Sequence, residues 1–164
     1  MPLFRRTIAD PGLKQYLGRR RVLASARSPR GEVLGLADAL VFPGSAGWTE
    51  VAWHDIEHGG WDQPSRTLRW TTVGGATSSL GLDEPGMLPD LFNERVTASI
   101  ACMRVVELAG SGTAVITARR DLGRNDADLI WRVSPGKGVQ QSAVDADPLV
   151  SLELERLRAE YDLG

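Results

Sequence analysis

The stretch that decides the fold is WTEVAWHDIEHGGWDQPSRTLRW, residues 48–70, which holds four of the five tryptophans of this 164-residue chain. Its centre, QPSR at residues 63–66, is typical of a type I β-turn, because proline at the second position fixes φ at about −65°. The stretch therefore predicts a β-hairpin. Counting outward from the turn gives a register of four cross-strand pairs: Asp62–Thr67, Trp61–Leu68, Gly60–Arg69 and Gly59–Trp70.

This register also predicts which side chains share a face, because residues directly opposite each other in a sheet point the same way. Trp61, Leu68 and Trp70 fall on one side, with Trp70 over the bare backbone of Gly59, and Arg69 falls on the other. The two adjacent glycines predict a bulge or a sharp bend, which would let a long ribbon curl. The tryptophans have two interpretations: a buried core, or an exposed aromatic face that contacts a partner.

Length and composition favour a single cytoplasmic domain. The chain is long enough to bury a hydrophobic core and has no run of about 18 apolar residues, so we expect no membrane-spanning helix. The first residues lack the continuous apolar segment of a secretory signal. A single cysteine excludes an internal disulfide and fits a reducing compartment.

Charge divides the chain unevenly. The formal net charge is −2, yet residues 1–30 carry eight basic groups against one acidic group. The basic groups are Arg5, Arg6, Lys14, Arg19, Arg20, Arg21, Arg27 and Arg30. We predict a basic, partly flexible N-terminal arm over residues 1–18, followed by one α+β domain over residues 19–164. Such a terminus either is simply solvated or binds nucleic acid or an anionic membrane surface.

Hydrophobic patterns predict strands over residues 20–28, 32–44, 48–62, 67–70, 77–82, 113–120 and 129–134. Pro89 begins a predicted internal helix whose apolar stripe is Leu88, Phe92, Val96, Ile100 and Met103. The end of that segment, residues 104–108, is β-branched and reads equally well as strand. Asp147 is the predicted N-cap of a last helix that begins at Pro148. The expected fold is α+β: a strongly bent antiparallel sheet or small barrel with an internal helix and a C-terminal helix.

Residues 54–58, HDIEH, match the H-x-x-E-H pattern of inverted zinc proteases. That chemistry needs the two histidines on one face of a helix, whereas this segment reads as strand and separates them by about 13 Å. Cys102 lies in an apolar stretch with no histidine nearby in sequence, which favours an inert buried thiol. The sequence therefore predicts no catalytic, metal-binding or cofactor-binding residue.

Two lines of the sequence, VAWHDIEHGGWDQPSRTLRW (51–70) and LPDLFNERVTASIACMRVVEL (88–108), resemble an uncharacterised family of small actinobacterial proteins with a pleckstrin-homology-like (PH-like), β-rich domain. The resemblance covers residues 20–162, and W-x-x-I…W-D-x-x-x-R-T-L is its most specific part. It implies a bent β-barrel capped by a C-terminal helix and a non-catalytic recognition or scaffold module. The predicted internal helix departs from that plan, where the barrel has only loops.

These observations lead to a hypothesis of a non-catalytic cytoplasmic binding module, with a protein as the favoured partner. Nucleic-acid or anionic-membrane binding through the basic arm is one alternative. A small enzyme or ligand-binding protein with a pocket in the curved sheet is another. The candidate contact residues are Arg19, Arg20, Arg21, Trp53 and Trp61.

Overall fold

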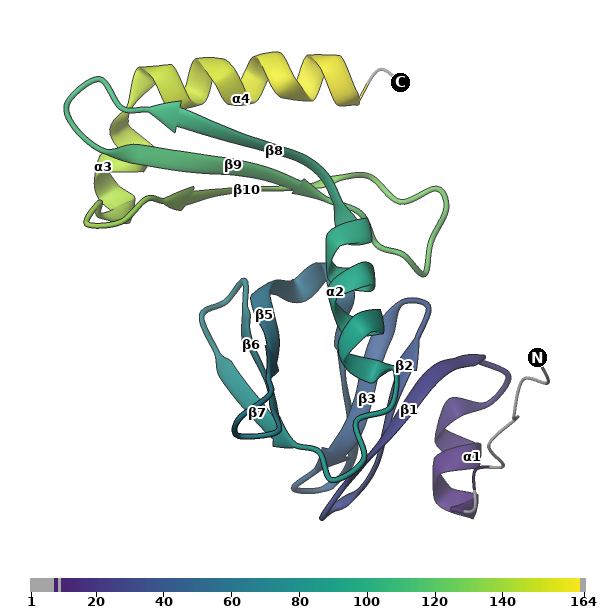
Figure 1. The fold of residues 1–164 in the computed structure, drawn as a ribbon. Coiled ribbons are helices and arrows are strands. Elements are labelled where there is room, and N and C mark those ends of the chain that lie inside the picture. Colours follow the sequence, from purple (N-terminus) through teal and green to yellow (C-terminus); the bar gives the residue numbers. More distant parts are fainter. Residues whose placement is uncertain (1–7, 9, 163–164) are drawn as a thin grey trace. The chain divides into compact units, whose positions relative to one another are not determined.

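The computed structural model describes residue 8 and residues 10–162 and divides the chain into two compact units, residues 1–95 and 96–164 (Figure 1). The described chain is α+β with three antiparallel sheets. The sequence predicted a single domain from residue 19 onward. The boundary lies inside one continuous helix, so no proline-, glycine- or serine-rich linker marks it in the sequence.

Unit 1 contains a short helix, two antiparallel sheets and most of a second helix. Its elements are α1 (Pro11–Leu17), β1 (Val22–Ser28), β2 (Gly31–Leu36), β3 (Ala39–Gly44), β4 (Gly47–Ala52), the 3₁₀ turn η1 (Trp53–Asp55), β5 (Ile56–Asp62), β6 (Thr67–Thr72), β7 (Thr77–Gly81) and α2 (Leu88–Ser99). Sheet A has the order β1-β2-β3-β4, and sheet B has the order β5-β6-β7. Each sheet is a simple meander.

The predicted hairpin register is confirmed. Sheet B pairs Asp62 with Thr67, Trp61 with Leu68, Gly60 with Arg69 and Gly59 with Trp70. The ladder shifts register between Ile56 and His58, so the bulge lies just before the two glycines rather than at them. The backbone N–H of Arg66 donates to the carbonyl of Gln63 at 3.3 Å and closes the turn.

Two predicted strands were too long. Residues 32–44 form β2 and β3, because the chain reverses at Ala37 and Asp38. Residues 48–62 are interrupted by η1, so β4 belongs to sheet A while β5 belongs to sheet B. Both breaks occur within stretches of strand-forming residues that contain no proline at the break, so periodicity alone did not reveal them.

Aromatic rings form the centre of the unit 1 core. Phe92 of α2 packs against Trp53 with ring centroids 5.8 Å apart and against Trp70 at 6.4 Å, while Phe42 of β3 meets Trp70 edge-on at 5.4 Å. These contacts bring η1, β3, β6 and α2 together. In β2, Gly35 lets α2 approach closely, since a Cβ at that position would lie 3.1 Å from Leu88 Cδ1.

Part of the predicted N-terminal arm is a docked helix. Residues 1–7 and 9, with Arg5 and Arg6, lie outside the described residues. Asp10 caps α1 by accepting the N–H groups of Gly12 at 2.8 Å and Leu13 at 3.3 Å. Leu13 and Leu17 are buried in one cluster with Leu34, Leu36 and Val41 of sheet A. This cluster holds α1 on the face of sheet A.

Unit 2 is a three-stranded meander covered by helices. It contains β8 (Ile100–Glu107), β9 (Thr113–Arg119), β10 (Ile130–Pro135), α3 (Gln141–Ala146) and α4 (Pro148–Tyr161), with sheet order β10-β9-β8. Leu157 of α4 is buried with Cys102, Ile116 and Ala118, which share one face of the sheet. Asp147 caps α4 and Pro148 opens it, as predicted.

The internal helix is shorter than predicted. It ends at Ser99, and Ile100 and Met103 belong to strand β8. Leu88 and Phe92 are buried as predicted, whereas Met103 is exposed. The helical spacing of apolar residues continued past Ser99 by coincidence, and the β-branched residues that follow were the better indicator.

Candidate functional site

The two candidate tryptophans lie in different surroundings. Trp53 in η1 is fully buried, and its indole N–H donates to the carbonyl of Leu36 at 2.9 Å. Its side chain is therefore part of the core and offers no surface to a partner. Trp61 in β5 is half-buried, and its indole N–H donates to Gln63 Oε1 at 2.7 Å. The aromatic face of the hairpin is thus mostly core, as Leu68 and Trp70 are also buried.

The three candidate arginines, residues 19–21, do not form one free basic patch. Arg20 pairs with Glu50 of β4 at 2.9 Å, and Tyr16 of α1 donates to the same carboxylate at 2.9 Å. Burial raises the pKa of Glu50, but the hydrogen bonds from Arg20 and Tyr16 outweigh burial and hold it below its ordinary value of 4.5. Arg19 and Arg21 are exposed.

The H-x-x-E-H segment does not lie on an α-helix. His54 is in η1 and His58 is in β5. Within the described residues, no group of three or more His, Cys, Asp and Glu side chains is arranged to hold a metal ion. Cys102 faces the unit 2 core and is buried. No helix in the described part of the chain is long and apolar enough to cross a membrane.

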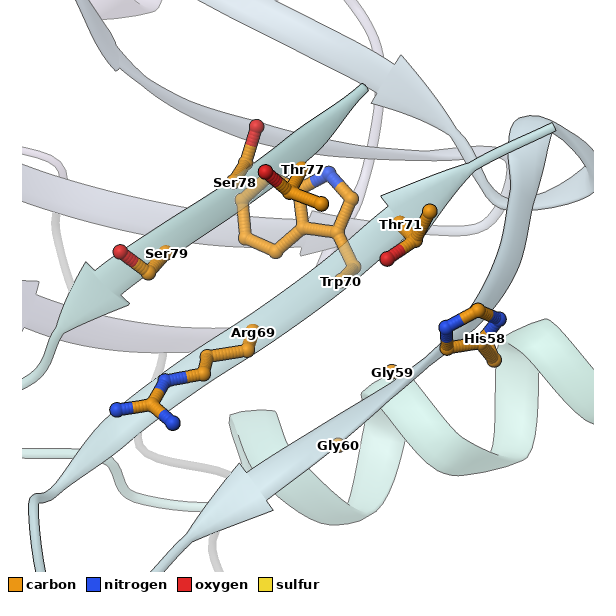
Figure 2. Close-up of a pocket in the computed structure, with 9 residues that line it drawn as sticks. All are labelled: His58, Gly59, Gly60, Arg69, Trp70, Thr71, Thr77, Ser78 and Ser79. Atoms are coloured by element: carbon orange, nitrogen blue, oxygen red, sulfur yellow. The ribbon is translucent and has the colours of Figure 1, made fainter. Parts of the chain in front are cut away.

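A groove of about 410 Å³ with several polar side chains lies on sheet B, and we call it the sheet B groove (Figure 2). Its lining residues come from all three strands of the sheet: His58, Gly59, Gly60, Arg69, Trp70, Thr71, Thr77, Ser78 and Ser79. The hydroxyl groups and the arginine can donate hydrogen bonds, and the imidazole can donate or accept one. This lining suits a polar or anionic ligand group.

The register arranges the groove in two rows on the face opposite the core. Gly60, Arg69 and Ser79 form one row across β5, β6 and β7. His58, Thr71 and Thr77 form the next row. Successive residues of a strand alternate between faces, so Trp70 with its neighbours Gly59 and Ser78 faces the other way.

The two adjacent glycines of β5 have different surroundings. A Cβ on Gly59 would lie 2.8 Å from Trp70 Cβ and 2.9 Å from Phe92 Cζ, so core packing requires glycine there. A Cβ on Gly60 would have no atom within 4 Å. Packing therefore explains Gly59 but leaves Gly60 unexplained. A glycine in a strand often marks a place where another backbone or a ligand comes close.

Strand β5 is also an edge of sheet B in the described chain, with β6 as its neighbour. Gly59 is exposed to solvent, although a Cβ atom on this residue would point into the core. The exposed surface of Gly59 is therefore main chain. A free strand edge with accessible N–H and C=O groups is a ready template for another strand.

A second hollow of about 410 Å³ lies at the turns that join β1 to β2 and β3 to β4. Its lining is mixed in charge and partly apolar: Asp10, Arg27, Ser28, Arg30, Gly31, Glu32, Pro43, Gly44, Gly47 and Trp48. Arg30 spans the two turns by donating to the carbonyl of Gly44 at 3.1 Å. Two cationic and two anionic side chains balance here, so the hollow has no clear preference for ligand charge.

None of the groove residues was a sequence-predicted site residue. The hairpin register already placed Arg69 on the face away from the tryptophans, and this was the one signal that could have drawn attention to it. Searches for relatives found no family model that matches the chain, no similar characterised protein and no matching solved structure.

Proposed function

We propose that unit 1 is a non-catalytic recognition module of PH-like form whose partner is a protein. The proposal of a PH-like form is supported by bent β-structure followed by a helix: α2 comes after the two sheets and packs its Phe92 against both Trp53 and Trp70. The helix in the capping position is α2, whereas the sequence had suggested the C-terminal helix.

The observation that carries the proposal of a protein partner is the exposed backbone of Gly59 on the edge strand β5. An extended peptide that adds to such an edge gains main-chain hydrogen bonds, and its alternate side chains give specificity. The sheet B groove lies beside this edge and could receive those side chains. Gly60, which has no contact to a neighbouring side chain on the groove face, leaves room for them.

Site-specific photo-crosslinking in the native host tests this proposal. A benzophenone side chain is introduced at His58, an exposed groove residue of the same edge strand, and in a control at Arg124, which is exposed and lies in unit 2. We expect one protein to be crosslinked from position 58 and not from position 124. The purified partner should then bind the wild-type protein, and Gly60→Gln should weaken binding at least tenfold without lowering the Tm. Wild-type affinity in Gly60→Gln would reject the β5 edge as the binding site.

The two alternative functions have weaker support. Nucleic-acid or anionic-membrane binding would use the exposed Arg19 and Arg21, but Arg20 between them is paired with Glu50. It predicts binding that falls steeply with salt and is lost in the double Arg19→Ala, Arg21→Ala variant. An enzyme would need a nucleophile and a base in hydrogen-bond reach. His58 and Thr71 are cross-strand partners, but among the described groove residues no hydrogen bond joins His58 to a hydroxyl group.

A further inference from the structure

We infer that the partner segment presents an acidic side chain opposite Gly60 and that Arg69 selects it. The inference rests on the proposed function, since it needs an extended segment paired with β5. The inference goes further by naming the group that the segment presents: a carboxylate, or a phosphate monoester on a serine or threonine. Both are anions that take hydrogen bonds from a guanidinium.

The row Gly60, Arg69, Ser79 provides the geometry. Neighbouring strands lie about 4.8 Å apart, so the Cα atom of a residue added opposite Gly60 would lie roughly 10 Å from that of Arg69. Nothing stands between them on the groove face, since the side-chain direction of Gly60 has no atom within 4 Å. Extended glutamate and arginine side chains together cover this distance. Any larger residue at position 60 would block it.

Arg69 is available for such a partner. It is exposed, and no hydrogen bond or ion pair is found for its guanidinium among the described residues. Asp62 of β5 lies on the same face, and its carboxylate already accepts the backbone N–H and the hydroxyl of Ser65. The hydrogen bonds from Ser65 lower the pKa of Asp62, and the charge of Arg69 lowers it further. Arg69 therefore interacts with this carboxylate only through its charge, and its N–H donors remain open to an anion of the partner.

The hydroxyl groups of the groove can bind an anion, and the charge of Arg69 favours an anion over a cation. Ser79 lies beside Arg69 in the same row, and the hydroxyls of Thr71 and Thr77 lie in the next row. All three can donate to an oxygen of the ligand. A lysine or arginine opposite Gly60 would instead face the guanidinium of Arg69, and such like-charge contacts are a common way to exclude wrong partners.

Titration of the full-length ¹⁵N-labelled protein with short capped peptides tests the inference. The probes are the pentapeptides TVEVT, TVQVT and TV(pS)VT, in which valine and threonine favour an extended chain. Binding is followed through the amides of Gly59 and Gly60 and the side-chain N–H of Arg69. Arg69→Gln is the test variant. Arg21→Gln makes the same charge change at an exposed position outside the groove and is the matched control.

We expect the glutamate and phosphoserine peptides to bind about two- to fivefold more tightly than the glutamine peptide, the size of a partly exposed ion pair. Arg69→Gln should remove this difference and Arg21→Gln should keep it. Equal affinity of all three peptides, with shifts at Gly59 and Gly60, would overturn the inference and leave the edge-binding function standing. No shift with any peptide would overturn both. Equal shifts from acetate or inorganic phosphate alone would overturn the role of the segment.

Discussion

Gly59 of β5 lies directly against Trp70 of β6, so that a Cβ on Gly59 would be only 2.8 Å from the Cβ of Trp70. The same Cβ would also meet the backbone carbonyl of Arg69 and would lie 2.9 Å from Phe92 Cζ. Backbone cannot move aside as a flexible side chain can. The pairing of a glycine with a large ring thus positions sheet B on the aromatic core.

We expect Gly59→Ala to lower the free energy of unfolding of unit 1 by about 1–3 kcal/mol, the usual cost of overpacking. Gly60→Ala is the matched control, because the neighbouring position is open and its φ is not in the left-handed region. We expect a change within about 0.5 kcal/mol there. Urea denaturation followed by tryptophan fluorescence measures both. Similar stabilities of the two variants would contradict the assignment of Gly59 to the core face.

Substitutions of Trp53 and Trp61 should also differ in how much they lower the free energy of unfolding, because only Trp53 is fully buried. Trp53→Phe removes a fully buried indole and leaves the carbonyl of Leu36 without its 2.9 Å hydrogen bond. We expect a loss of about 2–3 kcal/mol from the cavity and the lost hydrogen bond. Trp61→Phe, at a half-buried position, should cost less than about 1 kcal/mol. Thermal denaturation by circular dichroism compares them, and a larger loss for Trp61→Phe would be inconsistent with this core.

The hairpin and the helix caps were predictable from sequence because local chemistry determines them. Pro64 set the turn, and the turn set the register through Gly59 and Trp70. Asp147 and Pro148 likewise marked the start of α4. The break at η1 and the boundary inside α2 were not predictable, because each depends on packing between segments far apart in sequence. Trp53, for example, ends β4 by burying its ring against Phe92, 39 positions later.

The groove was harder to predict than the fold. Its polar side chains are ordinary for a solvent-facing strand, and single residues such as Thr77 or Ser79 carry no motif. The informative contrast is between Gly59, which packing explains, and Gly60, which it does not. The sequence cannot show this contrast, because it depends on which atoms surround each glycine in the folded chain. The arginines at positions 19–21 were conspicuous in sequence, yet Arg20 is committed to Glu50 through contacts 30 positions apart.

Asp147 should stabilise unit 2 by more than an N-cap alone, because its carboxylate accepts two backbone N–H groups. One carboxylate oxygen accepts the N–H of Leu149 at 2.9 Å, and the other accepts the N–H of Ala109 at 2.8 Å. The same side chain thus ties the β8–β9 loop to α4. We expect Asp147→Ala to destabilise unit 2 by about 2 kcal/mol, more than a typical lost cap. Asp147→Asn keeps one acceptor and should lose less. Equal losses in the two variants, measured by chemical denaturation, would argue against the double role.

The ion pair between Arg20 and Glu50 predicts a specific pH dependence. The pKa of Glu50 in the folded protein lies below its ordinary value of 4.5, because hydrogen bonds from Arg20 and Tyr16 outweigh the effect of burial. A carboxyl group with a lowered folded pKa binds protons more readily when unfolded. Its stabilising contribution is therefore complete above about pH 4.5 and declines as the pH falls through the folded pKa. Both side chains are about one-third exposed, so solvent screens the pair and its contribution is below about 1 kcal/mol.

Carboxyl-detected NMR titration of the folded protein measures the Glu50 pKa directly. Arg20→Gln removes the pair's cation and should raise that pKa, and the acid-induced loss of stability of unit 1 should become smaller. Arg19→Gln makes the same charge change next to Arg20, at an exposed side chain, and should leave the Glu50 pKa nearly unchanged. An equal rise in both variants would mean that the general positive charge of this segment, rather than the contact with Arg20, lowers the pKa of Glu50.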